Sequence, residues 1–451
     1  MAHDDHIENW FQQNISRYQQ QSQQQQRKSN LISTVRMVVF LLFITLSVIC
    51  FYQNWWPLLT LSLVAFGFLF GYLVNTHNSV KAKKKHFDLL VGINQDELKR
   101  LSLDLKGFAS GLEYSIPEHP YCVDLDLFGA HSLFQWLNRT VTNGGAKLLA
   151  HGLLQTPPPE KTLQQQQAVK ELSEKADWSQ HFLASGLAFK KDAAQVHSFL
   201  DWVSTPTTLP KWLKPALLVL PAVAIGLTAA YFTGALPGYW AFVALAINGF
   251  LLYKVQPLAE QTYQQTSQSI STLRSYEAMI ANIENTEFSS QLLVALRTSF
   301  IDKSERASVT IGQLKKLLSR IEVRQNFFYW IFKTYFLLDF ICIIKSEQWK
   351  ARHSKHISHW FESINRYELL TSLGSTAYSQ RQFSYPVLAL EPYCFKASGL
   401  AHPLIPVQER VVNDFSIENQ GTVVVLTGSN MSGKSTFLRT LGVNIILARL
   451  G

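Results

Sequence analysis

Two closely spaced apolar stretches near the amino terminus constrain the fold of this 451-residue chain more than any other feature. Residues 31–52 and 55–74 are each about 20 residues long, the length of helix that crosses roughly 30 Å of hydrocarbon. Only Gln53 and Asn54 separate them, and Trp55 and Trp56 stand at the turn, where interfacial aromatic residues are expected. We therefore predict a first transmembrane hairpin over residues 31–76.

A second pair of apolar stretches repeats the pattern at residues 215–232 and 236–253 and predicts a second hairpin over 211–256. Basic residues flank both pairs on both sides, with a cluster at Lys81, Lys83, Lys84 and Lys85 after the first. Positive flanks favour the cytoplasmic side, so both turns should lie outside a bacterial-type inner membrane and the soluble parts in the cytoplasm. Buried helical hairpins of a soluble core remain the alternative for each pair.

The remaining sequence divides into segments of ordinary polarity. Residues 1–30 are polar and glutamine-rich, and we expect a disordered or loosely helical segment without an assigned function. Residues 77–210 and 257–384 are typical of soluble helices. Within the latter, the apolar stretch 327–344 is long enough to span a membrane, but it contains Lys333 and Asp339. Each charge near mid-bilayer costs at least about 2.5 kcal/mol, which favours a buried core helix over a membrane span.

The last segment, 385–451, has the pattern of an α/β domain and contains a phosphate-binding motif. The sequence from Gly428 to Ser435 fits G-x-x-x-x-G-K-[ST]. The apolar run before it predicts a buried strand over 422–427, and a helix is predicted to follow Gly433. This context raises the motif above a chance match.

The motif predicts ATP and Mg²⁺ as ligands. Its glycines let backbone amides turn toward phosphates, and the helix N-terminus adds partial positive charge. Lys434 is predicted to reach the β- and γ-phosphates, and the Ser435 hydroxyl to hold Mg²⁺. The predicted nucleotide-binding residues are Gly428, Ser429, Asn430, Met431, Ser432, Gly433, Lys434, Ser435 and Thr436.

The interior of this loop, GSNMSGKSTFLR, resembles the ATPase domain of the MutS mismatch-repair family. GLAHPLI (399–405) and VVND (411–414) are similar to the lead-in to that loop. Residues 124–154, with a T-x-x-G turn before a helix, resemble the start of the family's helical core, and 367–377 resemble its final helix. The resemblance implies a mainly α fold: two transmembrane helical hairpins, a MutS-like core and lever, and the start of a C-terminal α/β phosphate-loop ATPase domain.

By this resemblance, the protein would be a membrane-anchored, ATP-dependent DNA-binding protein related to mismatch repair, and a homodimer when complete. The chain departs from the family in lacking any Phe-x-Glu, the wedge that reads mispairs. The family's acidic catalytic strand and dimerising helices come later than Gly451. We therefore expect a carboxy-terminally truncated fragment of an ATPase, with weak or no turnover and no identifiable catalytic residue.

The net charge of +9 is concentrated in clusters such as Lys345, Lys350, Arg352 and Lys355. This cluster is compatible with DNA phosphates, anionic lipid or a solvated helix face. His353, His356 and His359 recur at a spacing that does not favour a metal site. With Trp349 and Trp360, the first two are expected to pack along one helix face.

Two other functions remain open on the sequence. An ABC-type transporter subunit also joins membrane helices to a phosphate loop, but two short hairpins suit anchoring better than a transport pathway. A nucleotide-binding membrane scaffold without hydrolysis is the other alternative, because no residue of the chain is assigned to water activation.

Overall fold

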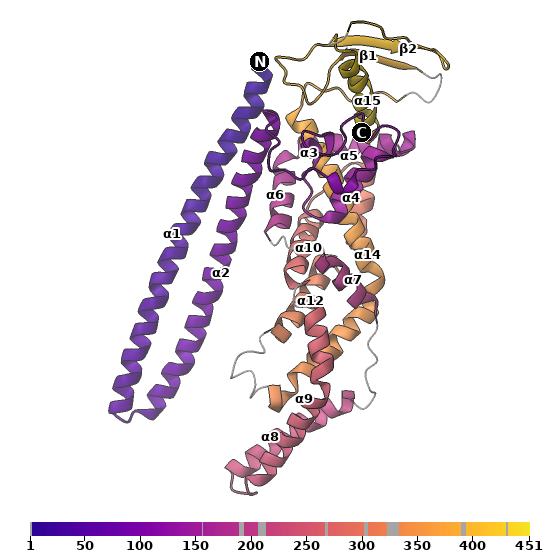
Figure 1. Cartoon of the computed structure of the whole chain (residues 1–451). Helices are drawn as coiled ribbons and strands as arrows, with labels where there is room; N and C mark the ends of the chain where they lie inside the picture. The colour runs from indigo at the N-terminus through magenta and orange to yellow at the C-terminus, as the bar shows by residue number, and fades with distance from the viewer. Residues whose placement is uncertain are drawn as a thin grey trace.

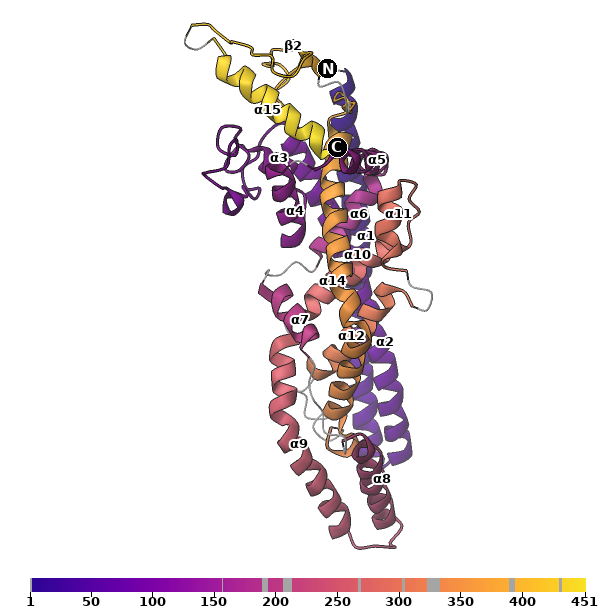
Figure 2. The same cartoon turned by 90° about the vertical axis from the view of Figure 1, so that its right-hand side faces the viewer.

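The computed structural model of the protein describes residues 2–155, 157–188, 194–205, 213–266, 269–301, 305–322, 333–388, 394–429 and 432–451. These ranges are mainly helical, with one two-stranded sheet among them (Figures 1 and 2). The helices are α1 (Ala2–Tyr52), α2 (Trp56–Leu101), the 3₁₀ helix η1 (Leu112–Tyr114), α3 (Leu133–Leu137), α4 (Asn143–Leu154), α5 (Pro159–Glu174), α6 (Ala176–Leu187), α7 (Ala194–Ser204), α8 (Leu213–Phe232), α9 (Tyr239–Thr266), α10 (Ser269–Glu284), α11 (Gln291–Thr298), α12 (Ala307–Glu322), α14 (Leu338–Ser379) and α15 (Lys434–Leu450). The strands are β1 (Phe395–Leu400) and β2 (Asn413–Ile417).

Helices α1 and α2 form a long antiparallel hairpin at one side of the molecule (Figure 1). Asn54 turns the chain between them with a φ of 57°. Both helices continue without interruption through residues 30 and 76, where the sequence suggests changes of segment. Each helix therefore has one apolar half near the turn and one polar half that runs back to the rest of the protein.

The glutamine-rich amino-terminal segment is a regular part of α1, so of the two expectations, a disordered or a loosely helical segment, the structure agrees with a helix. Ile7 and Phe11 are buried at 3% and 2% exposure, in a small cluster with Ala176 and Tyr378. Trp10 adds an edge-on contact to the Tyr378 ring, with centroids 4.8 Å apart. A few apolar residues on one face thus dock a polar helix onto α6 and the end of α14.

The apolar halves of the hairpins remain exposed. Three described helices, α1, α2 and α8, are long and apolar enough to cross a membrane, and at most 11% of each apolar window is buried. The fourth predicted span corresponds to a shorter apolar stretch, Tyr239–Lys254. The turns of the α1–α2 and α8–α9 hairpins both point away from the end that carries β1, β2 and α15 (Figure 1).

Helix α14 is the central support of the helical core and packs against α4, α5 and α12 (Figure 2). Its buried Glu368 accepts hydrogen bonds from the amides of Val141 and Thr142, at 2.8 and 3.1 Å. Thr142 in turn caps α4 by accepting from the amide of Gly145. A Cβ atom on Gly145 would lie 2.4 Å from the Glu368 carboxylate. This close approach is the physical reason for glycine in the T-x-x-G turn.

The apolar segment 327–344 is described from Lys333 onward, and residues 327–332 lie outside the described ranges. Leu337 and Phe340 are each 1% exposed, which agrees with a buried segment. We had expected these residues to pack into the main core. Their apolar neighbours belong instead to α8 and α9.

The two strands pair in antiparallel register, with Phe395 opposite Ile417 and an irregularity between Ala397 and Leu400. The Asp414 carboxylate stabilises this irregularity by accepting hydrogen bonds from the Gly399 amide at 2.7 Å and the Ser398 hydroxyl at 2.9 Å. The same two hydrogen bonds lower the pKa of Asp414. The sheet also contacts α15, the helix that follows the phosphate-binding motif, through β1 and through Phe415 of β2.

The run predicted as a buried strand, 422–427, differs from expectation. In the ranges that the structure describes it pairs with no other strand, and Val423 and Val425 are 85% and 77% exposed. A buried parallel strand needs neighbouring strands at its edges and cover on both faces. Neither is supplied here by the described residues.

Candidate nucleotide-binding site

The phosphate-binding motif lies between the exposed run 422–427 and α15. The structure describes Gly428, Ser429 and residues 432–436 of this loop, which we call the phosphate loop, whereas Asn430 and Met431 lie outside the described residues. The Ser432 amide donates to the Ser429 carbonyl at 3.3 Å. The predicted site residues that can be described therefore lie together at the start of one helix.

The side chain of Lys434 folds back across the phosphate loop. Its ammonium group donates to the carbonyl oxygens of Gly428 and Ser429, each at 2.5 Å. A lysine that lies against loop carbonyls is positioned to exchange them for phosphate oxygens, which are stronger acceptors because they carry charge. The residue predicted to hold the phosphates thus already lies over the loop.

Gly433 makes the transition from loop to helix. Its φ of 82° and ψ of 10° are left-handed, a conformation that glycine adopts at little cost. The Phe437 amide then donates to the Gly433 carbonyl at 2.9 Å and begins the helical pattern. Ser435 and Thr436 are exposed in the first turn, where free helix amides favour an anion. The residues present fit a nucleotide phosphate with a magnesium ion at the Ser435 hydroxyl.

Helix α15 is held in place along its length. Near the loop, the Phe437 ring packs edge-on against Phe415 of β2, with centroids 5.6 Å apart. At the far end, Val443 and Leu450 are buried, and Gln165 of α5 donates to the Leu450 carbonyl at 2.7 Å. The phosphate loop is therefore presented by a helix whose other end is anchored in the helical core.

One contact beside the loop was not anticipated from the sequence. Arg439 of α15 forms an ion pair with Asp126 at 2.5 Å, although 313 residues separate the two. The ring of His402 is close by; burial lowers its pKa, and the positive charges of Arg439 and Arg410 lower it further. No local pattern could have predicted this grouping, because its members come from three distant segments.

The basic cluster on α14 is smaller than the sequence suggests. Lys345, Arg352 and Lys355 are exposed, but Lys350 is only 3% exposed. Its ammonium group donates to the carbonyls of Trp202 and Thr205 at 3.2 and 2.9 Å, where α7 ends. Lys350 is therefore a helix-capping residue of the core and is not available to DNA phosphates or lipid.

The histidine pattern on the same helix agrees with packing. The ring of His353 lies 5.2 Å from that of Trp349, and the ring of His356 lies 6.2 Å from that of Trp360. Both tryptophans are buried. These four side chains form two ring pairs along one side of α14, as expected.

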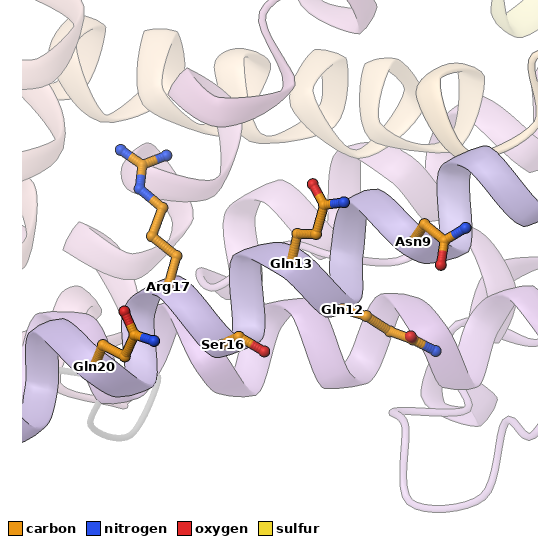
Figure 3. Close-up of a pocket in the computed structure, with 6 residues that line it drawn as sticks. All are labelled: Asn9, Gln12, Gln13, Ser16, Arg17 and Gln20. Atoms are coloured by element: carbon orange, nitrogen blue, oxygen red, sulfur yellow. The ribbon is translucent and has the colours of Figure 1, made fainter.

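A surface hollow lies along α1, far from the phosphate loop in sequence (Figure 3). Six residues of this one helix line it: Asn9, Gln12, Gln13, Ser16, Arg17 and Gln20. The lining offers amides, one hydroxyl and one guanidinium, but neither a histidine nor a carboxylate that could activate the hydroxyl. The phosphate loop remains the site with identifiable chemistry.

Comparison with known proteins gives a local similarity. No family model matches the chain. It is 31% identical over 102 residues to the DNA mismatch repair protein MutS of Thermotoga petrophila, covering 22% of this chain and 12% of that protein. It is 32% identical over 102 residues to MutS of Fusobacterium nucleatum, covering 21% and 11%.

A longer match, of 180 residues at 26% identity, is to the DNA mismatch repair protein MSH3 of Vanderwaltozyma polyspora, and covers 39% of this chain and 16% of that protein. In each of these three cases the match spans less than a fifth of the relative's own length. A part of this chain is therefore similar to DNA mismatch repair proteins of the MutS and MSH3 kind.

Proposed function

We propose that this chain is a membrane-anchored, MutS-related protein that binds ATP through the phosphate loop. The observation that carries the proposal is the position of Lys434 across the carbonyls of Gly428 and Ser429 at the start of α15. This arrangement suits a triphosphate, because loop amides, helix N-terminus and ammonium group all favour negative charge. The local similarity to MutS proteins supports the same assignment.

Magnesium belongs to the proposal as the counter-ion of the bound nucleotide. The Ser435 hydroxyl is exposed one residue after Lys434, where it would complete a Mg²⁺ shell formed mostly by phosphate oxygens and water. The metal would neutralise charge between the phosphates. The proposal concerns binding, and turnover is measured in the same preparation.

DNA is the proposed macromolecular partner, and a homodimer is the proposed assembly. Both rest on the similarity to proteins whose names assign them to DNA mismatch repair. Without a Phe-x-Glu wedge in the sequence, we propose affinity for structured or mismatched duplex without the family's mispair-reading contact.

The bilayer is proposed to hold the apolar halves of both hairpins. The exposed side chains there are large and apolar, for example Leu42, Phe68 and Phe242 at 64%, 80% and 74% exposure. Contiguous apolar surface of this kind is unfavourable in water and marks an interaction site. Because both turns point the same way, one membrane could receive both hairpins and leave α15 in the cytoplasm (Figure 1).

The test of nucleotide binding uses the detergent-solubilised chain, a photoreactive ATP analogue and Mg²⁺. Lys434→Ala should lose labelling by at least tenfold, the equivalent of about 1.4 kcal/mol, because a charged phosphate contact disappears. Lys396→Ala is the matched control, since this lysine is exposed and forms an ion pair with the exposed Glu418. Equal labelling of Lys434→Ala and the unsubstituted chain would exclude the proposed role.

The same preparation tests the partner and the turnover. Filter binding with homoduplex, mismatched and branched DNA should show retention that rises with the ATP analogue. Absence of affinity for all three would remove DNA from the proposal but leave nucleotide binding intact. Phosphate release from ATP above that of Lys434→Ala would show that the protein also hydrolyses ATP. No phosphate release would favour a nucleotide-binding scaffold without hydrolysis.

A further inference from the structure

Residues 333–344, the described part of the apolar segment 327–344, lie against the second hairpin. Leu337, Phe340 and Ile344 share a buried apolar cluster with Leu252 of α9. Leu217 and Leu220 of α8 and Leu251 of α9 pack against the same cluster. The first turns of α14 thus pack against the α8–α9 hairpin. The small apolar cluster that they form is separate from the main core.

Polar contacts show how far along the hairpin this segment reaches. The hydroxyls of Tyr335 and Thr228 lie 3.4 Å apart, and Thr228 is about 22 Å along α8 from its start at Leu213. The side-chain amide of Asn248, well inside α9, donates to the Thr334 carbonyl at 3.1 Å. Residues 334 and 335 therefore lie beside the length of the hairpin, between its base and its turn.

The two charges that argue against a membrane location neutralise each other. Lys333 and Asp339 form an ion pair at 2.9 Å, and their side chains are 21% and 5% exposed. A lone charge is costly in hydrocarbon, whereas paired charges that face the interior of a helical bundle are the form in which charges occur there. Because the two charges are paired, the cost of a lone charge in hydrocarbon no longer argues against a membrane location for this segment.

The exposed side of the segment is apolar, like the exposed surface of the α8–α9 hairpin beside it. Phe336 is 40% exposed beside the ion pair, and the hairpin itself exposes Leu218 and Phe242 at 79% and 74%. We propose that residues 333–344 enter the bilayer together with α8 and α9 as a third membrane element, with the Lys333–Asp339 pair enclosed between them. This inference rests on the proposed membrane anchoring and adds an element to it.

The experiment measures the depth of nitroxide labels in the full chain in phospholipid vesicles. The native cysteines Cys50, Cys122, Cys342 and Cys394 are replaced by alanine, and circular dichroism confirms retained helix. Single cysteines are then placed as Phe336→Cys in the segment, Phe242→Cys on α9 and Lys355→Cys on α14. Collision rates with oxygen, which concentrates in lipid, and with a water-soluble nickel chelate are compared at each site.

Lys355 is the matched aqueous control because it is exposed on the same helix, about 22 Å along α14 from Phe340. We expect the oxygen-to-nickel ratio at Phe336→Cys to equal that at Phe242→Cys and to exceed that at Lys355→Cys several-fold. Should Phe336→Cys alter the fold, Leu338→Cys, two residues further along the chain and half-buried, serves as a second position with the same expectation.

Two contrary outcomes are distinguishable. If Phe336→Cys behaves like Lys355→Cys while Phe242→Cys still reports lipid, the segment lies in water or against another protein and the inference is overturned. If Phe242→Cys also reports water, the proposed membrane anchoring by the second hairpin fails, and the third element fails with it.

Discussion

The guanidinium group of Arg139 binds both carboxylate oxygens of Glu97, at 2.7 and 2.8 Å, inside the protein. Burial alone would raise the pKa of Glu97, but the positive charges of Arg139 and Arg100 outweigh it and lower the pKa. Ser379, at the end of α14, donates a further hydrogen bond to the same carboxylate at 3.2 Å. The polar half of α2 is therefore part of the core, and the first hairpin extends from it.

Loss of this carboxylate charge should destabilise the protein strongly. Glu97→Gln leaves two buried guanidinium groups without their counter-ion, and breaking a buried pair in this way costs about 3–5 kcal/mol. Denaturant unfolding of the solubilised chain, followed by circular dichroism, measures the loss. Glu362→Gln is the control, because its pair with Arg366 is exposed on both sides and is worth at most about 1 kcal/mol. Equal effects of the two substitutions would contradict the structural role of Glu97.

The amino-terminal turns of α1 should undock when their aromatic anchor is removed. Phe11→Ala deletes a ring that is 2% exposed in the cluster with Ile7 and Tyr378, and such a truncation costs about 3 kcal/mol. Limited proteolysis should then cleave within the glutamine-rich segment many times faster than in the unsubstituted chain. Gln13→Ala, on an exposed face of the same helix, should leave the cleavage rate unchanged. Rapid cleavage of the unsubstituted segment would show that it is not docked in solution.

Acidification should weaken the contact between α2 and α6. His86 Nε2 and His181 Nδ1 are 2.9 Å apart, so one neutral ring donates to the other. Burial lowers the pKa of both histidines; the charge of the neighbouring histidine lowers that of His86 further, whereas Asp177 partly opposes the effect at His181. The unfolded chain then binds more protons than the folded one below about pH 6.5, so stability is lost as the pH falls through that value.

The measurement is the unfolding midpoint of the solubilised chain between about pH 7.5 and pH 5.5. His86→Gln should flatten the decrease, since only one titrating ring then remains at the contact. The carboxylates of Asp177 and Asp88 and the cations Arg17, Lys84 and Lys85 also lie around this contact. His359→Gln, at an exposed position, should leave the slope intact. An unchanged slope in His86→Gln would assign the pH response to other groups.

The exposed valine run should promote self-association of the isolated chain. Val423 and Val425 are exposed, β-branched and unpaired among the strands that the structure describes, a pattern that favours pairing with another chain. The double substitution Val423→Thr and Val425→Thr should reduce light scattering of the concentrated, solubilised protein without changing its helix content. The same double change at Val411 and Val412, which are exposed outside the run, should have a smaller effect. Equal light scattering from all three proteins would show that the valine run does not promote self-association.

Features set by neighbouring residues could be predicted from the sequence. The turn at Asn54 and the exposed apolar halves of α1 and α2 follow from a contiguous apolar composition that is interrupted by two polar residues. The helix that begins at Lys434 was expected from its place directly after the phosphate-binding motif, and Gly433 makes the transition in a left-handed conformation. The placement of Lys434 over its own loop is equally local, because five and six residues separate it from the carbonyls that it contacts.

Features that depend on distant partners could not be predicted. Lys350 belongs by sequence to a basic surface cluster. In the structure it is buried, and its ammonium group donates to the carbonyls of Trp202 and Thr205. The valine run has the composition of a core strand, yet it remains exposed because no described strand lies beside it.

The sequence by itself therefore determined which parts of this protein are apolar hairpins and where its phosphate loop begins, because both depend on the order of adjacent residues. Only the tertiary structure decided that the glutamine-rich helix docks through Phe11, that Arg139 neutralises Glu97, and that residues 333–344 accompany the second hairpin. Each of these depends on bringing together segments far apart in the chain. Burial and charge pairing are then gained only in the folded arrangement.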